Sequence, residues 1–325
     1  MKYDLAQHSM QGARPTNQDR VGCAERDNAV LMVLADGLGG HAGGEIAAEL
    51  FTQSLLQAFR SIRQPVITQP SAFLALSILQ AHKQIAGYSK TRFPDKQPRT
   101  TCVVCLVQNG YAYWAHVGDS RLYHFHNDRL LKRTIDDSAI ERLRQNGLIT
   151  EEDMQKHPNK GQITRCVGGP RKPSISLGEE TRLEPGDTLL LCTDGVWEGL
   201  SAKELVPFLN HDPLDEGIEE MLHAVEKKMG ENCDNISAIV LRWRDEVTTH
   251  PPLQSGKATT VNQDTLWQRA QSRSIHNELR AEHKLKTEPK PEAEEEEEQP
   301  QDPKARTART IQELEDYLSR FNNKL

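Results

Sequence analysis

Four aspartates stand where strand-like apolar segments of the sequence end or begin. Asp36 follows Leu-Met-Val-Leu-Ala, Asp194 follows Leu-Leu-Leu-Cys-Thr, Asp119 follows Trp-Ala-His-Val-Gly, and Asp234 precedes Ile-Ser-Ala-Ile-Val-Leu. If they converge, each pair of charges ~4 Å apart repels by about 4 kcal/mol at an effective dielectric near 20, so a cation must offset them. Carboxylates without a nearby histidine or cysteine set favour Mg²⁺ or Mn²⁺ over Zn²⁺. Two such ions, ~3.5–4 Å apart, can ionise a water and hydrolyse a phosphate ester.

The glycine-rich segment after Asp36 permits other interpretations. An Asp-Gly pair after a strand is typical of a hairpin turn, which would account for Asp36 or Asp194 taken alone. Residues 37–42, Gly-Leu-Gly-Gly-His-Ala, also fit the outline of a dinucleotide-binding loop. That function is disfavoured, because Asp36 would direct its charge at the pyrophosphate and the following helix leads into another helix. A phosphate cradle, or carbonyls that bind a metal, remain open for these glycines.

Arg14 is a candidate for phosphate binding. It lies five residues before Asp19 in Arg-Pro-Thr-Asn-Gln-Asp. The forked guanidinium group of arginine matches the spacing of phosphate oxygens. An arginine before a proline is also commonly an ordinary surface residue, so this position supports phosphate chemistry only together with the aspartates.

The elements that must position these residues occur in batches. The apolar pattern predicts strands over 3–10, 20–25 and 29–35, helices over 45–60 and 71–88, and a meander of four strands between 101 and 133. It then predicts a helix over 139–145, strands near 174–182 and 187–193, helices near 202–209 and 213–229, and a strand over 235–243. Batches of strands and helices favour an α+β fold with antiparallel sheets over a parallel βαβ fold.

Composition excludes several classes of function. The net charge is −7, from 40 basic and 47 acidic residues, which argues against a nucleic-acid partner. No apolar run is long enough to cross a membrane and the start lacks a secretion signal, so we expect no membrane partner and a cytoplasmic location. Six cysteines in 325 residues do not suggest a disulfide scaffold. Cys102 and Cys105, three apart in a predicted strand, should point to opposite faces as core thiols.

The end of the sequence differs from the rest. We expect a domain over residues 1–246, a polar and partly disordered linker over 247–303, and an amphipathic helix over 304–325. The helix has a narrow apolar seam made of Ile311, Leu314, Leu318 and Phe321. It would dock either on its own domain or on a partner protein, and we favour the partner. Thr307 and Thr310 each follow an arginine, and phosphorylation there would add negative charge near the helix start.

Eight short motifs, in order along the chain, resemble the metal-dependent type 2C serine/threonine protein phosphatases, in particular the bacterial members. They are R-P-T-N-Q-D (14–19), A-D-G-L-G-G-H-x-G-G-E (35–45), T-T (100–101), G-D-S-R-L-Y (118–123), T-x-D-x-S (134–138), T-R-x-V-G (164–168), C-T-D-G-V-W (192–197) and D-N-I-S (234–237). The resemblance covers residues 1–243. It implies an αββα sandwich, in which two antiparallel sheets pack face to face between helices, with a dinuclear metal site at one end.

The resemblance implies a set of metal ligands. Asp36 would bridge two ions, the carbonyl of Gly37 would bind the first, and Asp194 with Asp234 would bind the second. Asp119, together with Asp194, matches a weaker third site. The cofactors would therefore be two Mn²⁺ or Mg²⁺ ions and a weaker third ion.

The resemblance also implies a reaction. A metal-bridging hydroxide would attack the phosphorus of a phosphoserine or phosphothreonine in a protein, and so reverse a serine/threonine kinase. Arg14 would hold the phosphate, and Asp19 would act through metal-bound water. The alternative is a non-catalytic phosphoprotein-binding adaptor that works through its C-terminal tail. It is disfavoured because every implied ligand of the two core metals is present.

Three positions depart from the pattern of the family. Leu38 stands where some members have a histidine proposed to protonate the leaving group, so a water would have to serve. Asp137 stands where histidine is common, and we expect Asp136 or Asp137 to cap the following helix instead. Arg99 precedes the two threonines where glycine is usual. None of these changes removes an implied metal ligand.

Overall fold

The computed structural model describes residues 1–38, 43–92, 97–150, 153–154, 157–158 and 161–245. The predicted linker over 247–303 and helix over 304–325, with Thr307 and Thr310, lie outside the described residues. The division of the chain into three parts therefore stays a prediction.

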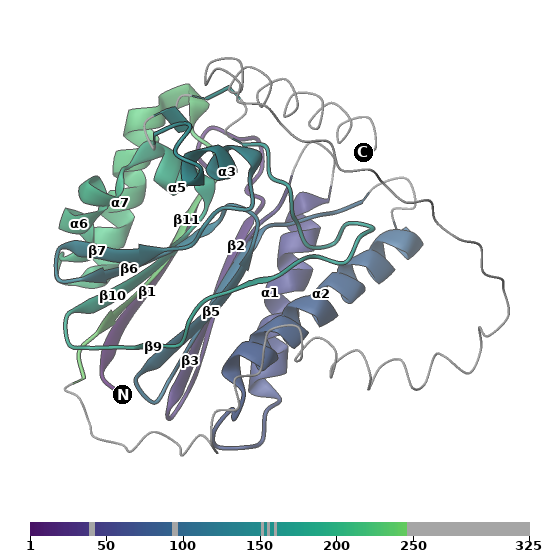
Figure 1. The fold of residues 1–325 in the computed structure, drawn as a ribbon, viewed down its shortest axis with the longest axis horizontal. Coiled ribbons are helices and arrows are strands. Elements are labelled where there is room, and N and C mark those ends of the chain that lie inside the picture. The colour runs from purple at the N-terminus through teal and green to yellow at the C-terminus, as the bar shows by residue number, and fades with distance from the viewer. Residues whose placement is uncertain (39–42, 93–96, 151–152, 155–156, 159–160, 246–325) are drawn as a thin grey trace, which may run out of the picture. The chain divides into compact units, whose positions relative to one another are not determined.

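Two antiparallel sheets form the centre of the fold, as predicted (Figure 1). The first has the order β1 (Tyr3–Met10), β11 (Ile236–Trp243), β10 (Asp187–Cys192), β6 (Arg121–His126), β7 (Arg129–Arg133). The second has the order β2 (Asp19–Arg26), β3 (Ala29–Asp36), β4 (Cys102–Gln108), β5 (Tyr111–Val117), β8 (Ser176–Leu177), and β9 (Thr181–Arg182) also pairs with β5. The strand predicted near 174–182 is thus two short strands.

Helices cover the outer face of each sheet, which completes the αββα sandwich (Figure 1). On the second sheet lie α1 (Gly44–Arg60) and α2 (Pro70–Arg92), and on the first lie α5 (Asp194–Gly199), α6 (Ala202–Leu209) and α7 (Leu214–Met229). The short α3 (Ala139–Gln145) follows β7, and the 3-10 turn η1 (Gly230–Asn232) precedes β11. None of the described helices combines the length and apolar character needed to span a membrane.

The apolar side chains form three layers. Successive side chains along a strand point to opposite faces of its sheet, and in the central strands both faces are buried. In β3, Leu31 and Val33 pack against α1 and α2, whereas Val30 and Met32 pack between the sheets. The third layer joins the first sheet to α6 and α7. The predicted opposite orientation of Cys102 and Cys105 is confirmed, since Cys102 packs between the second sheet and its helices and Cys105 packs between the two sheets. The cysteines that form no disulfide are Cys23, Cys102, Cys105, Cys166, Cys192 and Cys233.

The predicted meander between 101 and 133 is wrong in its topology. The hairpin of β4 and β5 belongs to the second sheet and the hairpin of β6 and β7 to the first, so the chain crosses between the sheets at residues 118–120. Gly118 has a φ of 105°, and a Cβ there would lie 2.7 Å from Cβ of Thr101, so only glycine fits. The crossing places Asp119 between the two sheets at one end of the sandwich.

Two local predictions also need correction. The residue that caps α3 is Ser138, whose hydroxyl accepts a hydrogen bond from the amide of Glu141 at 3.1 Å, and neither Asp136 nor Asp137 does so. In addition, no helix was predicted at 194–199, where Asp194 begins the short helix α5, and this excludes the alternative of a hairpin turn at Asp194.

Candidate active site

Asp19 and Asp36 lie opposite each other on neighbouring strands. Asp19 is the first residue of β2, and the antiparallel register pairs it with Asp36, the last residue of β3. Directly opposed residues in such a pair have Cβ atoms about 4.5–5.5 Å apart. The carbonyl of Asp36 accepts hydrogen bonds from the Thr101 amide and the Thr100 hydroxyl, both at 2.8 Å. The two threonines of the T-T motif therefore fix the end of the strand that carries Asp36.

Gly37 follows Asp36 at a point where three backbone segments meet. Its amide donates to the carbonyl of Gln18 at 3.2 Å. A Cβ at this position would lie 2.3 Å from the carbonyl oxygen of Gly44, at the start of α1. A side chain here would push α1 away from the strand end, which explains the glycine requirement in structural terms.

Asp194 and Asp119 come from the first sheet and from the crossing between the sheets. Asp194 follows β10 by one intervening residue, Thr193, whose hydroxyl donates to Oδ2 of Asp19 at 3.0 Å. Asp119 is 4% exposed and follows β5 by one intervening residue, Gly118. Since β3, β5 and β10 all end here, both sheets present their carboxylates at the same end of the sandwich.

Mutual repulsion and burial shift the proton affinities of these groups. Burial, followed by the charges of Asp194, Asp19, Asp119 and Asp234, raises the pKa of Asp36 well above its ordinary value. Burial, followed by the charges of Asp119 and Asp234, also raises the pKa of Asp194 well above its ordinary value. Burial also raises the pKa of Asp19 and of Asp119 to about 7. The five aspartates thus lie close enough to act on one another.

The carboxylate oxygens of this site lack sufficient partners within the described part of the protein and would suit a divalent cation. Asp36 and Asp194 form no salt bridge among the residues that the structure describes. Oδ1 of Asp19 is buried and has no hydrogen-bond partner there. All of these groups are hard oxygen donors, which fit Mg²⁺ or Mn²⁺. An orphaned carboxylate oxygen beside other buried carboxylates is the position at which a cation, or water bound to one, would remove the repulsion.

Arg14 binds Asp234 in this structure. Its Nε and Nη2 donate to the two carboxylate oxygens of Asp234 at 2.8 and 2.6 Å, and the pKa of Arg14 is raised, first by this hydrogen bonding. The Arg14 side chain is 57% exposed. With the side chains so arranged, no three His, Cys, Asp or Glu residues of the described chain form a ready metal-binding group. Both carboxylate oxygens of Asp234 are thus engaged by Arg14 in this arrangement.

Asn235 is a positioning residue whose role the sequence did not reveal. Its Oδ1 accepts from the amide of Gln18, and its Nδ2 donates to the carbonyls of Gln11 and Thr16. These bonds, at 2.8 to 3.0 Å, fasten the loop that carries Arg14 to the start of β11. The D-N-I-S motif contains this asparagine, but only the folded chain shows what it contacts.

The residues at 38, 99 and 137, which depart from the family pattern, connect the site to neighbouring loops. The amide of Leu38 donates to the carbonyl of Arg99 at 2.9 Å, so these two residues connect the site to the loop before β4. Asp137 accepts from the amide of Gly118 through Oδ2 at 3.1 Å and from Arg165 through Oδ1 at 2.7 Å. Asp137 therefore holds the backbone next to Asp119, although no proton-transfer role follows from these contacts.

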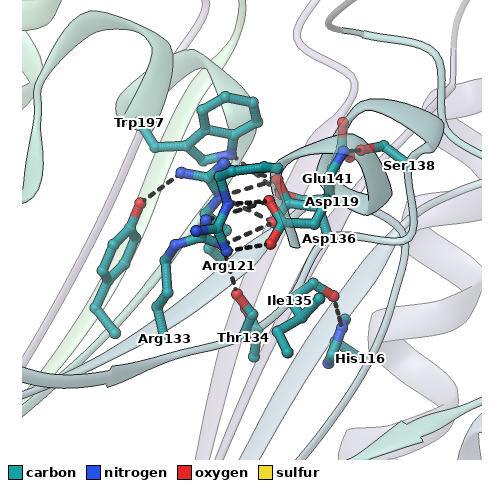
Figure 2. A network of polar contacts seen from close by, with 12 residues as sticks. His116, Asp119, Arg121, Arg133, Thr134, Ile135, Asp136, Ser138, Glu141 and Trp197 are labelled. Carbon is teal, nitrogen blue, oxygen red and sulfur yellow. Dashed lines mark hydrogen bonds and ion pairs between the residues drawn. The ribbon is translucent and has the colours of Figure 1, made fainter. Parts of the chain in front are cut away.

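A buried polar network beside Asp119 was not found from the sequence (Figure 2). Arg121 forms a two-pronged ion pair with Asp136, and both side chains are almost fully buried, at 3% and 2% exposure. The guanidinium lies over the ring of Trp197, 3.7 Å from its centroid. Arg121 and Asp136 lie in two of the motifs given above, but nothing in those motifs indicated that the two side chains pair across the β6–β7 hairpin.

Comparison with known proteins identifies relatives across most of the described chain. A family model described as protein phosphatase 2C matches residues 6–234, which include every candidate site residue from Arg14 to Asp234. The serine/threonine phosphatase stp of Listeria welshimeri is 30% identical over 231 residues, covering 70% of this chain and 90% of that protein. The similarity therefore extends over nearly the whole of this relative.

Solved structures show the same architecture. The serine/threonine phosphatase Stp1 from Staphylococcus aureus superposes with a TM-score of 0.69 at 28% identity, covering 75% of this chain and 96% of that one. The catalytic domain of the phosphatase PstP, solved in complex with 2 manganese ions, gives a TM-score of 0.63 at 27% identity, covering 75% and 99%. The sandwich thus has counterparts among phosphatases, one of them solved with manganese.

Proposed function

We propose that this chain, which belongs to the protein phosphatase 2C family and is a serine/threonine phosphatase, depends on divalent cations held by the carboxylates at one end of its sandwich. The observation that supports this most strongly is the convergence of five aspartates, of which Asp36 and Asp194 form no salt bridge with a basic residue in the described chain. Such a group of charges is stable only when cations or protons neutralise it.

Each residue has a proposed task. Asp36 would contact both of two ions, the carbonyl of Gly37 one of them, and Asp194 with Asp234 the other. Asp19 would contribute through an intervening water, from which its orphaned Oδ1 could accept a hydrogen bond. When bound, two divalent cations supply the activation of water for in-line attack on phosphorus and offset the charge that develops on the phosphate.

Arg14 would orient the substrate. Its guanidinium acts electrostatically on Asp194 and Asp36 as well as on Asp234, so it lies at the mouth of the carboxylate group. In exchange for the two oxygens of Asp234, the same forked donors can bind two oxygens of a phosphate monoester. This exchange would release Asp234 for a cation and place the phosphorus beside the activated water.

The leaving group requires a proton from elsewhere. Leu38 has no ionisable group, so the alkoxide of the released serine or threonine would take its proton from water. We further propose that the substrates are proteins phosphorylated by a serine/threonine kinase, and that the reaction takes place in the cytoplasm. Six free thiols, four of them buried, suit a reducing compartment. A protein partner for the helix over 304–325 stays part of this proposal.

The test is phosphate release by the purified full chain. We expect release from phosphothreonine and phosphoserine peptides with Mn²⁺ or Mg²⁺, none after chelation with EDTA, and recovery when Mn²⁺ is added back. A phosphotyrosine peptide of matched sequence is the substrate control and should react far more slowly. Tight binding of the phosphopeptide without turnover at any metal concentration would refute the proposal and support the adaptor instead.

A further inference from the structure

Trp197 connects the two segments that carry Asp194 and Asp119. It lies on α5, three residues after Asp194, and is 2% exposed. Its indole Nε1 donates a hydrogen bond to the main-chain carbonyl of Asp119 at 3.0 Å (Figure 2). The two aspartates come from different parts of the chain, so this bond links the helix that begins with Asp194 to the backbone of Asp119.

Arg121 prevents the indole ring from turning. Its guanidinium lies 3.7 Å from the ring centroid, on one face of Trp197. The same group donates to both oxygens of Asp136 and, through Nη1, to the hydroxyl of Tyr123 at 2.9 Å. Rotating Trp197 would therefore displace a buried arginine from its counter-ion, which is costly in a low-dielectric interior.

The other side of Asp119 is held as firmly. Asp137 Oδ2 accepts from the amide of Gly118 at 3.1 Å, and the amide of Asp137 donates to the carbonyl of Gly118 at 2.9 Å. With Gly118 fixed on one side and its own carbonyl fixed by Trp197, Asp119 keeps freedom mainly about its side-chain dihedral angles. The surrounding network thus fixes the backbone from which the Asp119 carboxylate projects, and so limits the positions that this carboxylate can reach.

We propose that Trp197, backed by Arg121, is a positioning residue that fixes the Asp119 carboxylate relative to Asp194 and so sets the affinity of the cation these two carboxylates share. This inference rests on the proposed function. It assigns Trp197 no contact with substrate or cation, because its only donor atom is used on the backbone of Asp119. Partners that orient metal ligands from behind typically change metal affinity by about 10-fold to 100-fold when they are lost.

The experiment is Trp197→Phe in the full chain, which removes the N–H donor and keeps an aromatic ring beneath Arg121. The matched control is Trp243→Phe, since Trp243 is also buried but stacks on Tyr3, away from the carboxylates. Mn²⁺ binding is measured by calorimetric titration, alongside kcat and KM as functions of Mn²⁺ concentration. We expect the weakest class of Mn²⁺ sites to bind about tenfold less tightly in Trp197→Phe alone.

Kinetics and a double mutant separate positioning from a general effect on folding. In Trp197→Phe, kcat should fall at limiting Mn²⁺ and recover at excess Mn²⁺, with KM for the phosphopeptide unchanged. In an Asp119→Ala background, adding Trp197→Phe should change Mn²⁺ binding no further, because its target is already gone. Arg121→Lys, which keeps the charge and loses the fork, should shift the weakest sites in the same direction and serves if Trp197→Phe does not fold.

Several outcomes would overturn the inference. These are unchanged Mn²⁺ binding in Trp197→Phe, equal weakening of every class of site, or a further loss in the Asp119→Ala background. The proposed function fails separately, if the wild-type chain shows no Mn²⁺-dependent phosphate release. In that case a shifted binding isotherm for Trp197→Phe would still support the positioning role.

Discussion

Two groups of buried acidic residues lie next to each other in this fold, and they are compensated in opposite ways. The first group is paired with arginines: Asp136 with Arg121, Asp137 with Arg165, and Glu141 with Arg133 and Arg144. The second group, at the ends of the strands, is Asp19, Asp36, Asp119 and Asp194. Burial is the largest influence on all four, and the charges of other aspartates come next for Asp36 and Asp194.

The pKa values of Glu141 and Asp36 show this difference, although burial still raises the pKa of Asp137. Burial alone would raise the pKa of Glu141, but the hydrogen bond from Arg144 and the charge of Arg133 bring it below its ordinary value. For Asp36, burial and four like charges act together, so its pKa is raised. A buried carboxylate that pairs with an arginine contributes to the stability of the fold. A buried carboxylate beside other carboxylates needs a proton or a cation to reduce the repulsion. The following experiments, taken from the largest expected effect to the smallest, could break or sharpen this distinction.

Asp36→Asn should reduce kcat/KM for a phosphothreonine peptide by about 1,000-fold or more, since the central carboxylate of the group is lost. Without divalent cations, the same variant should be more stable than wild type in thermal unfolding, because one source of repulsion is removed. Asp27→Asn, at the exposed turn of the same β2–β3 hairpin, is the control and should change neither quantity. Wild-type activity in Asp36→Asn would contradict the distinction outright.

Asp136→Asn should lower the free energy of unfolding by about 3–5 kcal/mol, because Arg121 stays buried without its counter-ion. Glu179→Gln breaks the exposed ion pair with Lys132, at 3.0 Å, and should cost less than about 1 kcal/mol. Urea unfolding of both variants, with cations removed, measures the difference. If the two variants lose equal stability, the arginine-paired group is not the structural one.

The stability of the chelated wild-type chain should fall as the pH rises from 5.5 to 7.5. Carboxylates whose pKa is raised bind more protons in the folded than in the unfolded chain between their ordinary pKa of 3.8 and a folded value of about 7. Each extra bound proton makes stability fall by about 1.4 kcal/mol per pH unit in that window. Glu141 and Asp187, whose pKa values are lowered, lose their contribution only at more acidic pH. Unfolding midpoints measured in EDTA should therefore decrease with pH, and saturating Mn²⁺ should remove the trend; rising midpoints in EDTA would contradict it.

Arg14→Lys should raise KM for the phosphopeptide by about tenfold and leave kcat within about threefold of wild type. Lysine keeps the positive charge but loses the two-pronged geometry that suits phosphate oxygens. Arg63→Lys, on an exposed stretch between α1 and α2, is the control and should change nothing. The measurement is KM and kcat for the phosphopeptide from steady-state kinetics at saturating Mn²⁺. An unchanged KM in Arg14→Lys would contradict phosphate binding by Arg14 and leave it only the ion pair with Asp234.

Much of the fold was predictable because the burial of strands and helices requires apolar residues at regular spacings in the sequence. The continuous apolar run before Asp36 indicated a strand buried on both faces, and β3 has that environment. The meander failed because the turn residues at 109–110 and 127–128 specify hairpins but carry no information on which sheet each hairpin joins. The six-residue α5 was missed because a helix this short has too few turns for a detectable period.

The amino-acid sequence by itself determined which segments become strands, which of them end in aspartate, and that acidic oxygens outnumber any nearby bases, because these are properties of short stretches of chain. Only the tertiary structure decided that Arg121 pairs with Asp136 and that Arg14 pairs with Asp234. The same holds for the hydrogen bonds that join Asn235 to the Arg14 loop and Trp197 to the backbone of Asp119. Those contacts join residues 15 to 220 positions apart. They depend on the crossing of the chain between two sheets, which no local pattern records.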